Sequence, residues 1–142
     1  MTRFAIFLLF LSVGGWAEEL YNLTVSTSNL KNNKGIVQFS LYNKDGTIPD
    51  KTQSHYYKKL RVSIKNHKAI VTFENLPKGR YAISLYHDEN NNNQIDKGFL
   101  LPKEGVGLSN YDKINFLNLP NFKSASFLLD SNKHIDIKTE YF

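Results

Sequence analysis

Apolar and polar residues alternate along most of the chain after residue 20, so that apolar side chains recur at every second position. Successive side chains of a β-strand point to opposite faces, and this period therefore predicts strands with one buried and one solvated face. The alternation predicts seven strands, at residues 21–25, 37–41, 60–64, 69–73, 81–85, 125–129 and 135–139. The last two flank a turn at residues 130–132, which predicts that they pair with each other as a hairpin.

Helical periodicity is weak by comparison. No window of helical length keeps its apolar residues at the 3.6-residue spacing, and only residues 52–60 suggest a single helical turn. The chain also has no internal repeat and no low-complexity tail. About seven short strands separated by turns indicate an all-β fold, a single antiparallel β-sandwich.

A sharp corner joins two of the predicted strands at residues 73–81, which read F-E-N-L-P-K-G-R-Y. Pro77 presets its own φ, and Gly79 can take a positive φ that a side chain would oppose. The core around this corner is expected to contain four side chains: Phe73, Leu76, Tyr81 and Ile83. This segment resembles the F-x-x-L-P-x-G-x-Y signature of prealbumin-like and Cna-B-like sandwiches, which indicates a fold and no activity.

The first 17 residues have the pattern of a secretory signal peptide. Arg3 supplies the positive charge, residues 4–13 are apolar, and Gly15 and Ala17 are small residues where a signal peptidase cleaves. The apolar run is too short to span a bilayer, which needs roughly 20 residues. We therefore expect export to the periplasm or the extracellular medium, with residues 18–142 as one mature domain and no stable membrane insertion after cleavage.

Composition narrows the chemistry of the mature chain. It has no cysteine, so it has no disulfide and no thiolate nucleophile or metal ligand. Without Arg3, 17 basic residues stand against 13 acidic ones, which is a mild positive excess. The densest basic run, at residues 58–68, alternates with apolar residues and is typical of the solvated face of a strand. We expect no nucleic-acid partner, although the run leaves open adhesion to an anionic surface polymer.

Residues 88–96, D-E-N-N-N-N-Q-I-D, carry the chain's most specific chemical pattern. Side-chain oxygens recur at every second position, and this is the spacing of a calcium loop. The match assigns five ligand positions, the fourth through its backbone carbonyl: Asp88, Asn90, Asn92, Gln94 and Asp96. Calcium is therefore the expected cation, and the alternative is a metal-free turn rich in asparagine, which tolerates turn conformations.

The loop departs from an EF-hand at its end. The twelfth position is Phe99, where an EF-hand has a bidentate glutamate, and no flanking helices are predicted. Glu104 is the nearest residue able to supply the missing carboxylate. With two carboxylates at the loop's ligand positions, we expect weak affinity, with a Kd of roughly 10⁻⁴–10⁻³ M.

An enzymatic alternative uses His87, Asp88 and Glu104 as the acid–base set of a small periplasmic hydrolase. The competing interpretation places His87 on the inward face of its strand, at the rim of the core. Residues 105–109, G-V-G-L-S, match neither a nucleophile elbow nor a dinucleotide loop, and we interpret them as a tight loop.

Four ordered motifs extend over nearly all of residues 18–142. They are L-P-K-G-R-Y-A-I at 76–83, H-D-E-N-N-N at 87–92, L-P-K-E-G-V-G-L-S-N at 101–110 and P-N-F-K-S-A-S-F at 120–127. Their order and spacing resemble domain of unknown function 2141, a family of small exported bacterial proteins. The resemblance implies an immunoglobulin-like or prealbumin-like sandwich with no established activity, and its D-x-N-x-N pattern supports the metal hypothesis.

Two positions depart from the family pattern. Asn93 stands where the family usually has glycine, and asparagine is the next-best residue for a left-handed conformation. Leu108 stands where the family typically has phenylalanine, which is a mild apolar exchange.

The favoured function is a non-enzymatic, monomeric calcium-binding module for an unknown ligand of the cell envelope or the extracellular medium. Loops held on a rigid sandwich commonly carry binding. The expected ligand surface is the loop end of the sandwich: Phe99, Pro102, Glu104, Gly107, Ser109 and Asn110.

Overall fold

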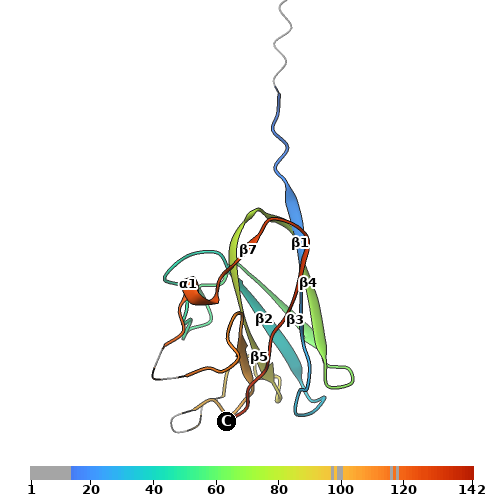
Figure 1. The fold of residues 1–142 in the computed structure, drawn as a ribbon. Helices are drawn as coiled ribbons and strands as arrows, with labels where there is room; N and C mark the ends of the chain where they lie inside the picture. The colour runs from blue at the N-terminus through green and yellow to red at the C-terminus, as the bar shows by residue number, and fades with distance from the viewer. Residues whose placement is uncertain (1–13, 97, 99–100, 116, 118) are drawn as a thin grey trace, which may run out of the picture.

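The computed structural model describes residues 14–96, 98, 101–115, 117 and 119–142. The elements of this part of the chain are β1 (Leu20–Thr27), β2 (Ile36–Tyr42), β3 (Lys58–Ser63), β4 (Ala69–Pro77), β5 (Gly79–Asp88), β6 (Val106–Leu108), α1 (Phe122–Ala125), β7 (Phe127–Leu129) and β8 (Lys133–Asp136). The strands form two sheets, one ordered β4-β1-β8 and one ordered β3-β2-β5-β6, with β7 also paired to β5 (Figure 1). The predicted all-β sandwich is thereby confirmed. The proposed signal peptide lies largely outside the described residues, since residues 1–13 are not among them.

The main core fills the space between the two sheets. Alternate residues of β1 and β2 contribute Leu23 and Val25 from one sheet and Val37, Phe39 and Leu41 from the other, all fully buried. The corner side chains Phe73, Leu76, Tyr81 and Ile83 belong to the same core, as predicted. Period-two alternation therefore identified the inward face of these strands correctly.

The predicted hairpin between the last two strands is wrong. β7 pairs antiparallel with β5, and β8 pairs in parallel with β1. The turn between them carries the chain from one sheet to the other, and the side chain of Asn132 accepts a hydrogen bond of 2.9 Å from the backbone N–H of Asn22 in β1. Alternation marks which residues face inward but does not choose the partner strand.

The expected helical turn at residues 52–60 is also wrong, because residues 58–60 belong to β3 and Asp50 holds the residues before them in a loop. Its carboxylate accepts hydrogen bonds from the backbone N–H groups of Ser54 and His55, at 3.2 and 2.9 Å. The helix present instead, α1, is capped by the side chain of Asn121, which accepts from the N–H of Ser124. Four residues are too few for a helical period to be detected in the sequence.

Three glycines have roles that differ from the sequence interpretation. Gly79 lies in β5 without a positive φ, and the left-handed residue at that corner is Asn75, with φ of 56°. Residues 105–109 are not a tight loop, because Val106–Leu108 form β6 against β5. A Cβ at Gly107 would lie 2.5 Å from the carbonyl oxygen of Lys138, and one at Gly105 would lie 2.5 Å from the Tyr141 ring. Close approach of the C-terminal segment explains these two glycines.

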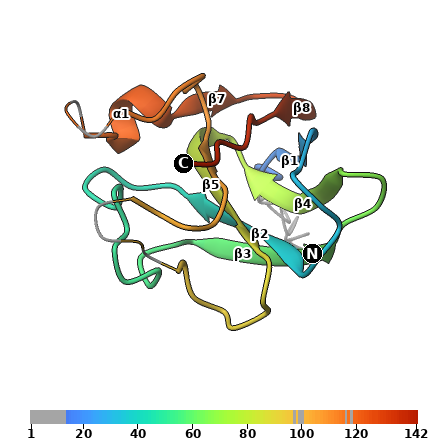
Figure 2. The ribbon, with the colours of Figure 1, turned by 90° about the horizontal axis from the view of Figure 1, so that it is seen from below.

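A second apolar cluster covers the outer face of the β3-β2-β5-β6 sheet. Its buried members are Tyr42, Ile48, Ala82, Leu108, Phe122 and Ala125. The connection after β2, drawn in cyan, and the connection between β6 and α1 both lie on the α1 side of the molecule (Figures 1 and 2). Among the described helices, none is long and apolar enough to cross a membrane.

Candidate functional site

Asp88 is the last residue of β5 and anchors the start of the candidate metal loop. It points to the outer face of the sheet, where its fully buried carboxylate forms an ion pair of 2.8 Å with Arg61 from β3. The same carboxylate accepts the backbone N–H groups of Asn92 and Asn93, at 3.1 and 2.9 Å. Arg61 also donates to the side chain of Asn93. Asp88 therefore curls the loop over itself, with its charge compensated by Arg61.

Three of the other predicted ligands, Asn90, Asn92 and Asp96, come together inside this curl. Asn90 and Asn92 each direct a side-chain nitrogen at the carboxylate of Asp96, at 2.5 and 2.7 Å. Their amide oxygens accept backbone N–H groups within the loop, those of Asn92 and Gln94. Asp96 is thus the centre of a small hydrogen-bonded cluster of three predicted ligands.

Glu104 joins the two ends of the loop. It is 3% exposed, and its two carboxylate oxygens accept the backbone N–H groups of Glu89 and Asp96, each at 3.1 Å. Burial raises the pKa of Glu104 above its usual value, and the nearby charges of Asp96 and Asp88 raise it further, although the two N–H groups oppose this. We expected Glu104 as a metal ligand, and in the structure its oxygens bind the loop backbone.

The loop needs two left-handed residues to close. Asn91 has φ of 57° and Asn93 has φ of 63°, so asparagine does adopt the conformation expected where the family usually has glycine. Gln94 is exposed, and Phe99 lies outside the described residues. The part of the chain that the structure describes holds no group of three or more His, Cys, Asp or Glu side chains placed to bind a metal ion. A cation in this loop would therefore take most of its ligands from amides and backbone carbonyls.

His87 faces the opposite side of β5 from Asp88. It is fully buried, and its ring nitrogens bond to the Tyr141 hydroxyl and the Lys34 carbonyl, each at 2.7 Å. The carboxylates of Asp88 and Glu104 are engaged on the loop instead. The acid–base set of the hydrolase hypothesis is thus not assembled, and His87 has the structural role that the competing interpretation gave it.

A serine, a histidine and an aspartate also meet on the outer face of the other sheet. The Ser26 hydroxyl donates to Asp136 at 2.8 Å and lies 2.9 Å from His134 Nε2. A catalytic triad requires the carboxylate to orient the imidazole and the imidazole to take the serine proton. Here the hydroxyl proton is directed at the carboxylate, so the arrangement is not that of a nucleophile.

Two adjoining hollows on the outer face of the β3-β2-β5-β6 sheet were not found from the sequence. The first, which we call the inner pocket, has a volume of about 300 Å³, and the second, which we call the outer trough, has about 1290 Å³. They are continuous through shared lining residues: Gln38, Asp50, Lys51, Gln53, Ile95 and Val106. The signal that could have revealed them is the presence of apolar residues, such as Ile48 and Ile95, in connections with no strand pattern.

Three of the residues expected to form a ligand surface at the loop end are not accessible to a ligand. Glu104, Gly107 and Ser109 are buried, and the Ser109 hydroxyl donates to the carbonyl of Ala125 at 2.7 Å. Asn110 is exposed, but its amide donates to carbonyls of the α1 segment. These residues fasten loops to the sheet.

A comparison with protein families decides what kind of chain this is. Residues 25–138 match the model of DUF2141, a family described as uncharacterized protein conserved in bacteria. The chain belongs to DUF2141. The match begins within β1, extends past β8 and includes the whole 88–96 loop of this DUF2141 protein, as the sequence motifs predicted. No curated protein and no solved structure matches it.

Proposed function

We propose that this DUF2141 protein is an exported, non-enzymatic β-sandwich module that binds calcium weakly in its 88–96 loop. The observation that carries the proposal is the convergence of Asn90 and Asn92 on the carboxylate of Asp96. Three oxygen-bearing side chains meet in a loop whose ends are held by Asp88 and Glu104. Loops fixed at both ends lose less conformational entropy when a ligand orders them further.

The ligand chemistry favours calcium over magnesium. The two asparagine amides now direct nitrogen at Asp96, and a half-turn of each amide would direct oxygen there instead. Calcium accepts such mixed carboxylate, amide and carbonyl sets in flexible geometry, whereas magnesium demands a near-ideal octahedron. Arg61 already compensates Asp88, so Asp96 supplies most of the attraction and a Kd of roughly 10⁻⁴–10⁻³ M is expected.

Thermal unfolding in calcium and in EDTA tests the proposal. Calcium at about ten times Kd should stabilise the protein by about 1.4 kcal/mol and raise its Tm. Asp96→Ala should remove this shift, because it deletes the carboxylate at the centre of the cluster. Asp136→Ala, an exposed carboxylate on the other sheet, is the matched control and should keep it. Overlapping curves for the unmodified protein, or a shift that survives in both Asp88→Ala and Asp96→Ala, would overturn the calcium site.

Export is supported by the charged, apolar and small residues of positions 1–17. Protein recovered from the periplasm or the medium should have Glu18 as its first residue, as determined by N-terminal sequencing or intact mass. A chain that keeps its first 17 residues and stays inside the cell would contradict export.

A further inference from the structure

The floor of the inner pocket is a polar row on an otherwise covered sheet face. Gln38 and Ser40 of β2 lie in register with Tyr86 and Ser84 of β5. Gln38 and Tyr86 are each 3% exposed, although they alternate with the core residues of their strands. Their hydrogen bonds are long, 3.5 Å between Tyr86 and Gln38 and 3.3 Å between Gln38 and Ser40. Because these hydrogen bonds are long and therefore weak, the same polar groups can bond to a ligand without the loss of a strong hydrogen bond.

The walls of the inner pocket are apolar and come from two connections and one strand. Ile48 extends from the connection after β2, Ile95 from the loop after β5, and Leu108 from β6. The volume of about 300 Å³ is at the small end of ligand pockets and equals roughly ten water molecules of liquid. A mainly apolar cavity with a few polar groups on its floor is the usual form of a small-molecule site.

The outer trough gives the pocket a basic mouth. Lys51, Lys59 and Arg61 line it, together with the carboxylates of Asp50 and Asp96. Asp50 is buried and bonded to the chain, and Arg61 is paired with Asp88. Lys59 lies 4.9 Å from the centre of the Tyr56 ring, and neither it nor Lys51 has a carboxylate partner among the described residues. Lys51 and Lys59 together outweigh the single carboxylate of Asp96, and the net positive charge at the mouth favours an anionic group there.

We propose that this cleft binds a medium-chain carboxylate, with its alkyl chain in the inner pocket and its carboxylate at Lys59 and Lys51. The size of the pocket sets the chain at about ten non-hydrogen atoms. The apolar walls take the alkyl chain, and the Lys59 ammonium, adjacent to Ser40 across the β2–β3 pairing, takes the negative charge. The floor comes from β2 and β5 and Lys59 from β3, whereas Ile95 and Asp96 of the lining belong to the 88–96 loop, so the site is tested without calcium.

Titration calorimetry of the full chain with decanoate tests this site. It is done in EDTA, so that calcium neither occupies the loop nor precipitates the carboxylate. Lys59→Gln should weaken binding about fivefold and reduce its dependence on salt. Ser84→Leu places a side chain on the pocket floor and should weaken binding by roughly tenfold or more. 1-Decanol, which lacks the charge, should bind more weakly than decanoate and with equal affinity to the unmodified protein and Lys59→Gln.

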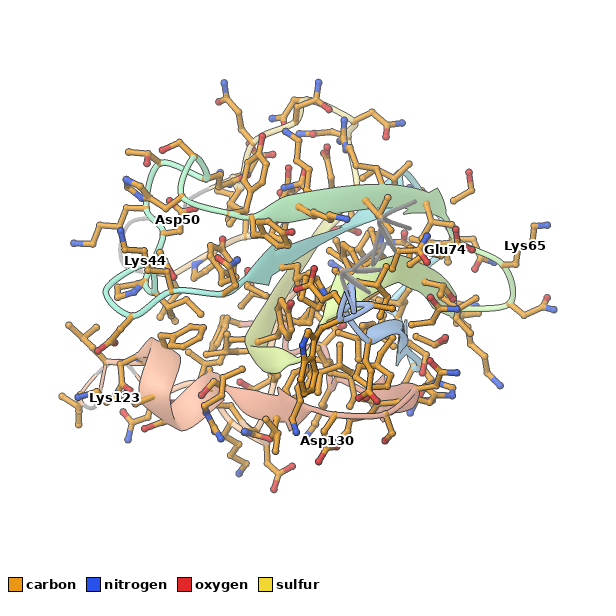
Figure 3. The ribbon with its side chains drawn as sticks, turned by 90° about the horizontal axis from the view of Figure 1, so that it is seen from above. Lys44, Asp50, Lys65, Glu74, Lys123 and Asp130 are labelled. Atoms are coloured by element: carbon orange, nitrogen blue, oxygen red, sulfur yellow. The ribbon has the colours of Figure 1, made fainter. Side chains whose placement is uncertain are left out.

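Two matched controls separate this site from general surface effects. Lys65→Gln removes a cation that Figure 3 places on the opposite side of the molecule from Asp50, and it should leave binding unchanged. Thr72→Leu adds the same side chain to the outer face of the other sheet and should also leave it unchanged. If Ser84→Leu does not fold, the Lys59→Gln and decanol comparisons still decide. Absence of decanoate binding, or equal affinity in Lys59→Gln and Lys65→Gln, would overturn the proposal.

Discussion

The two sheets, β4-β1-β8 and β3-β2-β5-β6, show the same alternation of polar and apolar residues, but their outer faces differ in burial. On the first, Thr24 and Thr72 bond to each other across the strands at 3.0 Å, and Ile70 is 55% exposed. On the second, the equivalent outward residues Gln38 and Tyr86 are buried. An outward position in a strand is therefore solvated only where no loop crosses it.

The loops explain the difference between the two faces. Three long connections, at residues 43–57, 89–105 and 109–121, join elements of the β3-β2-β5-β6 sheet or lead from it to α1. The connections at 43–57 and 109–121 bring apolar side chains to the second cluster, and the connection at 89–105 brings Ile95 to the inner pocket. The β1–β2 and β3–β4 connections are shorter. The covered face consequently carries the candidate calcium loop and the cleft, and the open face carries neither. Loops supported by a rigid sheet are the usual carriers of binding.

The largest expected effect is a difference in the free energy of unfolding between side-chain-truncating variants on the two faces. Leu108 is 5% exposed in the second cluster, and Leu108→Ala should lower the free energy of unfolding by about 2–4 kcal/mol because it leaves a cavity. Ile70→Ala on the open face should change it by about 0.5 kcal/mol or less. Urea unfolding of both variants measures the contrast. Similar losses would mean that the second cluster is not a core, and the distinction between the faces would fail.

The sequence predicted the strands well because the inward residues of the main core follow a strict period of two. Val37 and Phe39 are buried as the pattern requires. It failed for Gln38 and Tyr86, which are buried on a face where Ile48 and Leu108, from other segments of the chain, line the same pocket. Period alone contains no information on which loop folds over which face.

In the candidate site, too, local features could be predicted from the sequence and long-range contacts could not. The spacing of Asn90, Asn92 and Asp96 is local, and the structure brings these side chains together through hydrogen bonds, while their role as metal ligands stays a prediction. The ion pair of Asp88 with Arg61 and the bonds of Glu104 to the loop backbone are long-range, and the sequence assigned neither. Arg61 was interpreted as part of a solvated strand face, because its partner lies 27 positions away.

The smallest expected effect concerns Glu104 and is a dependence on pH. Burial raises the pKa of Glu104 in the folded protein above its value in the unfolded chain, so the folded state holds the proton more tightly. Its contribution to stability is therefore fully present below the unfolded pKa and is lost as the pH rises through the folded pKa. The stability of the unmodified protein relative to Glu104→Gln should accordingly increase as the pH falls through this window, as measured by urea unfolding at several pH values.

Asp50 on the same covered face provides a control of opposite sign. Burial would raise the pKa of Asp50, but the N–H groups of His55 and Ser54 outweigh it and hold the pKa below its usual value. Its contribution is present above the unfolded pKa and is lost as the pH falls through the folded pKa. Stability relative to Asp50→Asn should thus decrease on acidification while stability relative to Glu104→Gln increases. If both stability differences changed in the same direction with pH, the pKa values of Glu104 and Asp50 would not be shifted in opposite directions, and the assignment would be wrong.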